Sequence, residues 1–230
     1  MDGKDILIEV DESFWIGARL HLINKSAPTV LFFHGNGEIA SDYDEISQIY
    51  NQKKINFIIA DYRGYGLSNG IPDVKNIQSD AHIILDYILK YLKERNFSGA
   101  LFLMGRSLGS VSVLELTKRY PNDFSGLVIE SGFAEEEPFF ELMGTTPEKA
   151  GFKKEDGFLN GEKIKTYNGP LLIIHADQDH IVPFNQGKLL YLTCCSENKK
   201  LLVIPNANHN NLLEMGFQQY LYEIEIFINP

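Results

Sequence analysis

The pentapeptide Gly-Arg-Ser-Leu-Gly at 105–109 places a serine where nucleophilic chemistry is possible. An apolar run precedes it and an amphipathic segment follows it, which predicts that Ser107 lies on a tight turn between a strand and a helix. Gly105 and Gly109 lack side chains, so the strand and the helix can approach closely there. The helix would also direct backbone N–H groups and its positive end toward the site. This context, rather than the pentapeptide alone, makes Ser107 the candidate nucleophile.

A serine hydroxyl is a weak nucleophile at neutral pH and needs a neighbouring base. The sequence offers His209, which lies in Asn-Ala-Asn-His-Asn at 206–210, after the last apolar run. An imidazole has an ordinary pKa of about 6.5, so it can take up and return a proton near neutral pH. The remaining histidines lie in an expected strand or helix, at the start of a Gly-rich loop, or ahead of the last strand: His21, His82, His34, His175 and His180. We therefore predict that His209 is the base.

A carboxylate is needed to hold the tautomer of such a base and to stabilise the imidazolium. The stretch HADQDHIVP at 175–183 contains two aspartates, Asp177 and Asp179. We favour Asp179, because Asp177 is close to the end of a strand and is better placed to cap the turn. Glu130, at the end of the preceding strand, is a more distant alternative.

The negatively charged oxygen of a tetrahedral intermediate needs two hydrogen-bond donors. One is expected to be the backbone N–H of Leu108, directly after the nucleophile. The other is expected to be the backbone N–H of Asn36 in His-Gly-Asn-Gly at 34–37, although that stretch could also be a turn that simply requires glycine. No histidine pair has the spacing of a metal site, and no nucleotide-binding glycine loop is present, so neither a metal nor a cofactor is expected.

These residues follow a series of solidly apolar runs that alternate with amphipathic segments. Continuous apolar runs are typical of strands that are covered by helices on both faces. The runs are Thr29–Phe33, Ile55–Ala60, Ala100–Met104, Leu127–Glu130, Leu171–Ile174 and Leu201–Ile204. The expected helices are Val74–Arg95, Leu108–Tyr120, Phe184–Leu192 and Leu212–Phe227. Strands alternating with helices predict a mostly parallel sheet, at whose carboxyl edge the candidate residues would meet.

Two weaker strands precede this series, one with alternating Ile6, Ile8 and Val10 and one over 14–23. We expect them to pair antiparallel at the edge of the sheet, which makes an eight-stranded α/β fold with helices on both faces. Arg63, in the loop after the second apolar run, is expected to tie loops together through a buried ion pair.

The interval 133–169 is longer than an ordinary crossover, and we interpret it as a short cap over the site. It contains apolar side chains that could line a pocket or belong to the core: Phe133, Phe139, Phe140, Leu142, Met143 and Phe152. Its acidic residues, Glu135 to Glu137, together with Glu38, form either a solvated face or a site for an ammonium group.

The composition is ordinary for a globular chain, with 44% hydrophobic and 23% charged residues among 230, and we expect one domain over 1–230. A net charge of −10 disfavours binding to nucleic acid or to anionic membranes. No apolar stretch is long enough to span a bilayer, and no secretory signal is visible. The only two cysteines are adjacent, so a disulfide framework is not expected, and we predict a cytoplasmic protein of undetermined oligomeric state.

These motifs together resemble those of the α/β-hydrolase superfamily, in which the order Ser, Asp, His is typical. The resemblance covers nearly the whole chain and rests on HGNG at 34–37, DYRGYGLS at 61–68, GRSLGS at 105–110, DHIVP at 179–183 and NANHN at 206–210. It is strongest to small α/β-hydrolase-domain proteins and the serine aminopeptidase S33-like group. The resemblance implies a catalytic triad of Ser107, Asp179 and His209, with Asn36 at the oxyanion site. The short cap departs from relatives with a large helical cap.

We therefore expect a serine hydrolase that cleaves a carboxylic ester or thioester of a small acyl substrate through an acyl-enzyme on Ser107. A small peptidase or amidase of the same fold is an alternative. A protein of this fold that binds a ligand without turnover is a further alternative, which the retention of every expected site residue disfavours.

Overall fold

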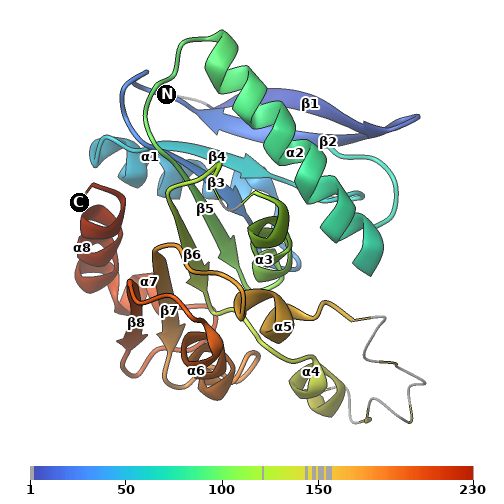
Figure 1. Cartoon of the computed structure of the whole chain (residues 1–230), viewed down its shortest axis with the longest axis vertical. Helices are drawn as coiled ribbons and strands as arrows, with labels where there is room; N and C mark the ends of the chain where they lie inside the picture. The colour runs from blue at the N-terminus through green and yellow to red at the C-terminus, as the bar shows by residue number, and fades with distance from the viewer. Residues whose placement is uncertain are drawn as a thin grey trace.

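A computed structural model describes residues 3–120, 122–142, 145–146, 149, 153 and 157–229. One sheet of eight strands runs through the molecule in the order β1-β2-β4-β3-β5-β6-β7-β8 (Figure 1). The strands are β1 (Lys4–Asp11), β2 (Phe14–His21), β3 (Thr29–Phe33), β4 (Asn56–Ala60), β5 (Leu101–Arg106), β6 (Gly126–Glu130), β7 (Leu171–Ala176) and β8 (Lys199–Ile204). The α/β fold predicted from the sequence is confirmed.

The sheet is parallel from β4 to β8, and only β2 runs in the opposite direction, pairing antiparallel with both β1 and β4. The carboxyl ends of the parallel strands therefore meet at one edge of the sheet, where ligands bind in folds of this kind. Every residue of β3, β4 and β6 is buried, because helices cover both faces there. The edge strand β8 has half-exposed positions instead.

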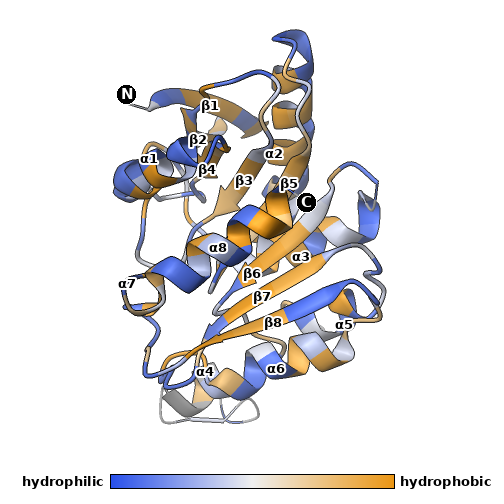
Figure 2. Cartoon of the chain, turned by 90° about the vertical axis from the view of Figure 1, so that its left-hand side faces the viewer, coloured by the Kyte–Doolittle hydropathy of each residue, from blue (hydrophilic) through white to orange (hydrophobic). Residues whose placement is uncertain are grey.

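The helices form two layers, one on each face of the sheet (Figure 2). They are α1 (Asp44–Gln52), α2 (Val74–Glu94), α3 (Gly109–Arg119), α4 (Glu137–Leu142), α5 (Asn160–Ile164), α6 (Phe184–Thr193), α7 (Leu212–Met215) and α8 (Phe217–Ile228), with a 3-10 turn, η1, at Ala40–Tyr43. One apolar core joins the sheet to α2, α3, α5 and α6, and the other joins it to α1, α7 and α8. Neighbouring residues of β5 enter different cores, since Leu103 lies in the first and Met104 in the second.

One expectation about the helices is wrong, and one helix was not predicted. The helix expected over Leu212–Phe227 is interrupted at Gly216, where a Cβ would lie 2.6 Å from the side chain of Ile204. The close approach to β8 thus separates α7 from α8. The helix α1 was not anticipated, although Ile46, Ile49 and Tyr50 have the spacing of one apolar helix face.

The expected cap interval divides into two parts. Its end packs into the main core, because α5 lies against α3 and Ile164 and Tyr167 are buried. Its beginning contains α4 near the carboxyl edge of the sheet (Figure 1). Met143 and Phe152, and the side chains of Phe139 and Leu142, lie outside the described residues.

None of the helices over the described ranges combines the length and apolar character that crossing a bilayer requires.

Candidate active site

Ser107 lies on a strained turn between β5 and α3. Its φ is +51°, a backbone conformation that costs energy for any residue with a side chain. Its N–H donates to the carbonyl of Glu130 at 2.9 Å, and its own carbonyl accepts from the Ser110 hydroxyl at 2.7 Å. The flanking glycines permit the turn, since a Cβ at Gly105 would lie 2.3 Å from the carbonyl oxygen of Gly109. The surroundings therefore hold Ser107 in a conformation that it would not adopt by itself.

His209 and Asp179 form a buried pair at the ends of β8 and β7. The His209 Nδ1 atom lies 2.7 Å from Asp179 Oδ2, while Asp179 Oδ1 accepts the N–H groups of Ile181 at 3.0 Å and Val182 at 2.8 Å. Burial by itself would raise the pKa of Asp179, but the hydrogen bonds and charge of its partners outweigh this effect and lower it. An ionised Asp179 can only accept, so Nδ1 carries the hydrogen and donates.

The structure distinguishes Asp179 from the two other carboxylates considered for this role. Asp177 is exposed, and its backbone N–H donates to Ile204 at the end of β8. The carboxylate of Glu130 interacts with Arg106 and Tyr220 instead of with His209. Asp179 alone among the three touches His209.

Ser107 and His209 line the same cavity, whose volume is about 620 Å³. No hydrogen bond joins their side chains, although the structure describes both residues. Such bonds are often long or absent before a substrate binds. Because Nδ1 is engaged by Asp179, Nε2 is the ring nitrogen that remains to exchange a proton with the hydroxyl.

The predicted oxyanion donors also line this cavity. The backbone N–H groups of Asn36 and Leu108 donate to no acceptor within the described residues. In contrast, the N–H of Gly35 donates to Glu38 Oε2 at 2.7 Å, so it is engaged. The Tyr65 hydroxyl donates to the side-chain oxygen of Asn36 and helps to hold this turn. Two unpaired N–H groups thus line the same cavity as Ser107, an arrangement that could stabilise an oxyanion.

His34 holds the loop that contains Gly35 and Asn36 in place. Its carbonyl accepts the hydroxyl of Tyr62 at 2.6 Å, and its Nδ1 lies 2.8 Å from the carbonyl of Gly35. Its Nε2 lies 3.2 Å from Asp61 Oδ1, which also accepts the N–H of Ala40. The side chain is completely buried, so its role is to fix the loop.

Known proteins resemble this chain over most of its length. The pattern of the family described as serine aminopeptidase, S33, matches residues 24–150, which is more than half of the chain. The chain belongs to this family. It is therefore a member of the α/β-hydrolase superfamily and of a family of hydrolases.

Curated relatives of this S33-family chain include alpha/beta hydrolase domain-containing protein 17C of Mus musculus, which is 29% identical over 208 residues. That alignment covers 87% of this chain but 59% of the relative. Protein bem46 of Schizosaccharomyces pombe is 28% identical over 193 residues, covering 81% of this chain and 63% of the relative. The chain thus spans about six-tenths of the length of these relatives.

Solved structures share the fold at low sequence identity. Est1E of Butyrivibrio proteoclasticus, bound to ferulic acid, has a TM-score of 0.76 at 20% identity and covers 96% of this chain and 99% of its own. The esterase Pf2001 of Pyrococcus furiosus has a TM-score of 0.78 at 18% identity and covers 98% of this chain and 91% of its own.

Sequence reasoning missed the central role of Arg106 in this S33-family site. Its guanidinium lies 3.0 Å from Glu38 Oε1 and 3.1 Å from Glu130 Oε1, and it donates to the carbonyl of His209 at 2.9 Å. Burial opposes its charge, but Glu130 and Glu38 outweigh that effect and raise the pKa of Arg106. Arg106 thereby connects the turn at Ser107 to the oxyanion loop and to the loop of His209. The only signal was its place inside the pentapeptide, because its partners are far away along the chain.

The remaining candidates have other partners. Arg63 forms the buried ion pair that was expected, lying 2.8 Å from Asp80 of α2. Of the histidines, His21 lies near Asp44 and His82 near Glu115, while His175 lies 2.9 Å from the carbonyl of Val182. Among the described residues, no group of three or more metal-ligating side chains lies close enough together to bind an ion.

Proposed function

We propose that this protein is a serine hydrolase that cleaves a carboxylic ester or thioester through an acyl-enzyme on Ser107. The observation that carries the proposal is the 2.7 Å contact between Asp179 and His209, a histidine that lines the same cavity as Ser107 and two unpaired N–H groups. The strained turn at Ser107 and the S33 family match support the same reading.

In the proposed reaction, the Ser107 oxygen attacks the acyl carbonyl while Nε2 of His209 removes its proton. The N–H groups of Asn36 and Leu108 stabilise the charge that develops on the carbonyl oxygen. The imidazolium then returns the proton to the departing alcohol or thiol, leaving the acyl group on Ser107. A water molecule, deprotonated by His209, attacks the acyl-enzyme and releases the acid. Asp179 stays ionised and orients the ring throughout.

The cavity above Ser107 suits an uncharged acyl group better than an amino-terminal residue. Its apolar lining comes from several elements and consists of Val74, Leu108, Phe133, Phe140, Phe158 and Ile181. Its two carboxylates already have partners: Glu136 accepts the N–H of Phe158 at 2.6 Å, and Glu38 is paired with Arg106. An aminopeptidase needs a carboxylate that is available for the substrate's ammonium group. The cavity therefore favours ester or thioester over peptide substrates.

We further propose that residues 1–230 form a single domain and that the interval 133–169 supplies a short cap beside the acyl group. Phe133, Phe140 and Phe158 of this interval line the cavity. Phe133 and Phe158, whose ring centroids lie 5.8 Å apart, support this role. We also propose the cytoplasm as the location, which is supported by Cys194 and Cys195, neither of which forms a disulfide. Fractionation of cells that express the protein would test this location.

The decisive test is labelling with a fluorophosphonate probe followed by mapping of the modified residue. We expect a single adduct on Ser107, which prior acylation by an ester substrate prevents. Comparison of p-nitrophenyl esters, thioesters and aminoacyl anilides then ranks the bond types. Labelling at another residue, or a folded protein that resists the probe and hydrolyses no acyl compound, would contradict the proposal and favour a binding protein.

A further inference from the structure

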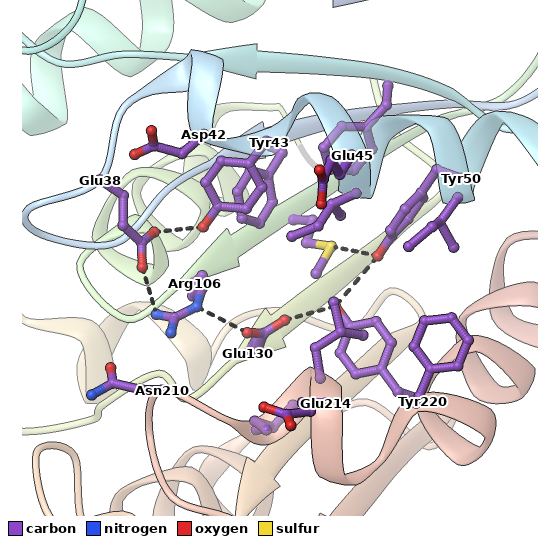
Figure 3. A pocket seen from close by; sticks show the side chains of 18 of the residues that line it. Glu38, Asp42, Tyr43, Glu45, Tyr50, Arg106, Glu130, Asn210, Glu214 and Tyr220 are labelled. Carbon is purple, nitrogen blue, oxygen red and sulfur yellow. Dashed lines mark hydrogen bonds and ion pairs between the residues drawn. The ribbon is translucent and has the colours of Figure 1, made fainter.

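A second hollow adjoins the active site on the other side of Arg106. It is a groove of about 470 Å³ between the η1–α1 segment and the α7–α8 segment (Figure 3). We call it the α1–α7 groove. Its floor is formed by the buried side chains of Phe32, Phe57, Met104 and Tyr50. Formation of the proposed acyl-enzyme on Ser107 does not require the α1–α7 groove.

Aromatic rings and carboxylates dominate the groove. The rings belong to Phe32, Tyr43, Tyr50, Phe57, Phe217 and Tyr220. Asp42 and Glu45 project from one side, and Glu214 projects from the other (Figure 3). All three carboxylates are exposed, and Glu45 and Glu214 form no ion pair or side-chain hydrogen bond with any described residue.

The other lining residues do not neutralise the negative charge of these carboxylates. Arg106 is the only Arg or Lys among the described lining residues, and its guanidinium faces two carboxylates, Glu38 and Glu130. The Tyr43 hydroxyl donates to Glu38, and the Tyr220 hydroxyl donates to Glu130 at 2.6 Å. Burial, followed by the nearby carboxylates, raises the pKa of both phenols, so they remain neutral. The groove as a whole is therefore negative.

A negative groove with aromatic walls matches one kind of occupant. Ammonium groups on an apolar body are attracted to the faces of aromatic rings and to carboxylates at the same time. An anionic ligand would meet repulsion from Asp42, Glu45 and Glu214. A neutral apolar ligand would gain nothing from these carboxylates.

The position of His209 connects this groove to the reaction. His209 and Asn210 line both the α1–α7 groove and the cavity that contains Ser107. In acyl transfer, the base must return its proton to the leaving group, so the leaving group lies against His209. The acyl group would occupy the apolar cavity beside Ser107. The leaving group, which lies against His209, would then be at the entrance of the α1–α7 groove.

We infer that the α1–α7 groove receives the leaving group of the substrate, and that this leaving group is an alkylammonium alcohol or thiol. The inference rests on the proposed function, because it needs Ser107 to cleave an ester or thioester. His209 protonates the departing oxygen or sulfur, while Glu45, Glu214 and the exposed ring of Phe217 hold the cationic end.

The test compares two esters that differ only in charge. Butyrylcholine carries a quaternary ammonium, and 3,3-dimethylbutyl butyrate replaces that nitrogen by carbon in the same shape. We expect kcat/KM to be about tenfold higher for the choline ester. A factor of this size is typical when exposed carboxylates and an aromatic ring bind a cation. Raising the ionic strength from about 0.1 M to about 1 M shortens the Debye length from about 10 Å to about 3 Å and should reduce this ratio.

Substitutions locate the preference in the groove. In the double variant Glu45→Gln with Glu214→Gln, we expect most of the tenfold ratio to be lost. The ratio of kcat/KM for the two esters is measured on one protein. A general loss of folding or catalysis lowers both values equally and leaves the ratio unchanged. The matched control replaces two exposed glutamates outside the groove, Glu9→Gln with Glu197→Gln, and should keep the ratio of the unaltered protein.

Each result has a distinct meaning. A ratio near one, with the neutral ester hydrolysed through Ser107, overturns the inference and leaves the proposed function intact. A tenfold ratio that survives the double variant also overturns it, because the cation is then recognised elsewhere. Failure to hydrolyse either ester, together with no labelling of Ser107, contradicts the proposed function itself.

Discussion

The two hollows that meet at His209 differ in how their polar groups are arranged. In the cavity over Ser107, the carboxylates of Glu38 and Glu136 are held by partners within the protein. In the α1–α7 groove, Glu45 and Glu214 remain exposed and unpaired among the described residues. The first hollow can therefore select an acyl group through apolar burial, and the second can select by charge. His209 lines both hollows, and in the proposed reaction it contacts both halves of a substrate.

The largest effect is expected from Ser107, the proposed nucleophile, because the proposed use of both hollows depends on it. Ser107→Ala should lower kcat for every ester by about 10⁴-fold or more, whichever hollow the ester fills, because the acyl-enzyme cannot form. His209→Ala should cost about as much. Initial rates of ester hydrolysis measure this loss, with circular dichroism to verify folding.

Ser125→Ala is the matched control, since Ser125 is an exposed serine away from the site. It should retain full activity. If Ser107→Ala still hydrolysed one class of ester, that class would not depend on Ser107, and the two hollows would not serve one reaction.

The next largest effect concerns the boundary between the hollows. Arg106→Lys keeps a positive charge but loses the planar fork that reaches Glu38, Glu130 and the carbonyl of His209 together. We expect the rate of fluorophosphonate labelling to fall by about 10- to 100-fold, since a displaced base loses catalysis steeply.

Arg63→Lys provides a control of matched burial and pairing, because Arg63 is also a buried arginine with a carboxylate partner, Asp80. It should lose stability, measured by urea unfolding, without a comparable loss of labelling. Equal effects of the two substitutions on labelling would show that Arg106 acts through general stability.

A smaller effect should reveal the apolar selectivity of the Ser107 cavity. Each CH₂ that enters an apolar site contributes about 0.8 kcal/mol, or about fourfold in kcat/KM, until the space is filled. A series of p-nitrophenyl esters from acetate to decanoate should therefore rise to an optimum. Phe158→Ala enlarges the cavity and should move the optimum toward longer chains.

The half-buried Phe227 on the opposite face of the sheet gives the control Phe227→Ala, which should leave the optimum in place. A flat series would indicate that acyl chains do not enter this cavity.

The smallest expected effect is on the stability of the folded protein and comes from replacing Asp179, the partner of His209. Asp179 has a lowered pKa, so its ionised form stabilises the folded protein above the unfolded value of about 3.9. That stabilisation is lost as the pH falls through the lower folded value. The difference in urea midpoint between the natural protein and Asp179→Asn should thus be largest near neutral pH and should shrink below about pH 4.

Asp177→Asn, in the same loop but exposed, should show no such pH dependence of the difference. A difference that stayed constant with pH would show that Asp179 contributes by packing rather than by charge.

Much of the fold could be predicted because its signals are local. Strands buried on both faces are apolar at nearly every position, as at the four positions from Val30 to Phe33. The helix α1 escaped prediction although its narrow apolar face of Ile46, Ile49 and Tyr50 is present in the sequence. The break at Gly216 escaped because it depends on the distance to Ile204, which cannot be seen without the neighbouring strand.

The sequence by itself determined which residues could do chemistry: a serine between two glycines after a strand, with a carboxylate and a histidine in later loops. Only the tertiary structure decided between Asp177 and Asp179, and only it showed that Arg106 joins Glu38, Glu130 and the loop of His209. The reason is physical. A strand and its turn depend on residues adjacent in the chain, whereas an ion pair depends on where distant segments meet, and Arg106 and His209 are separated by 103 residues.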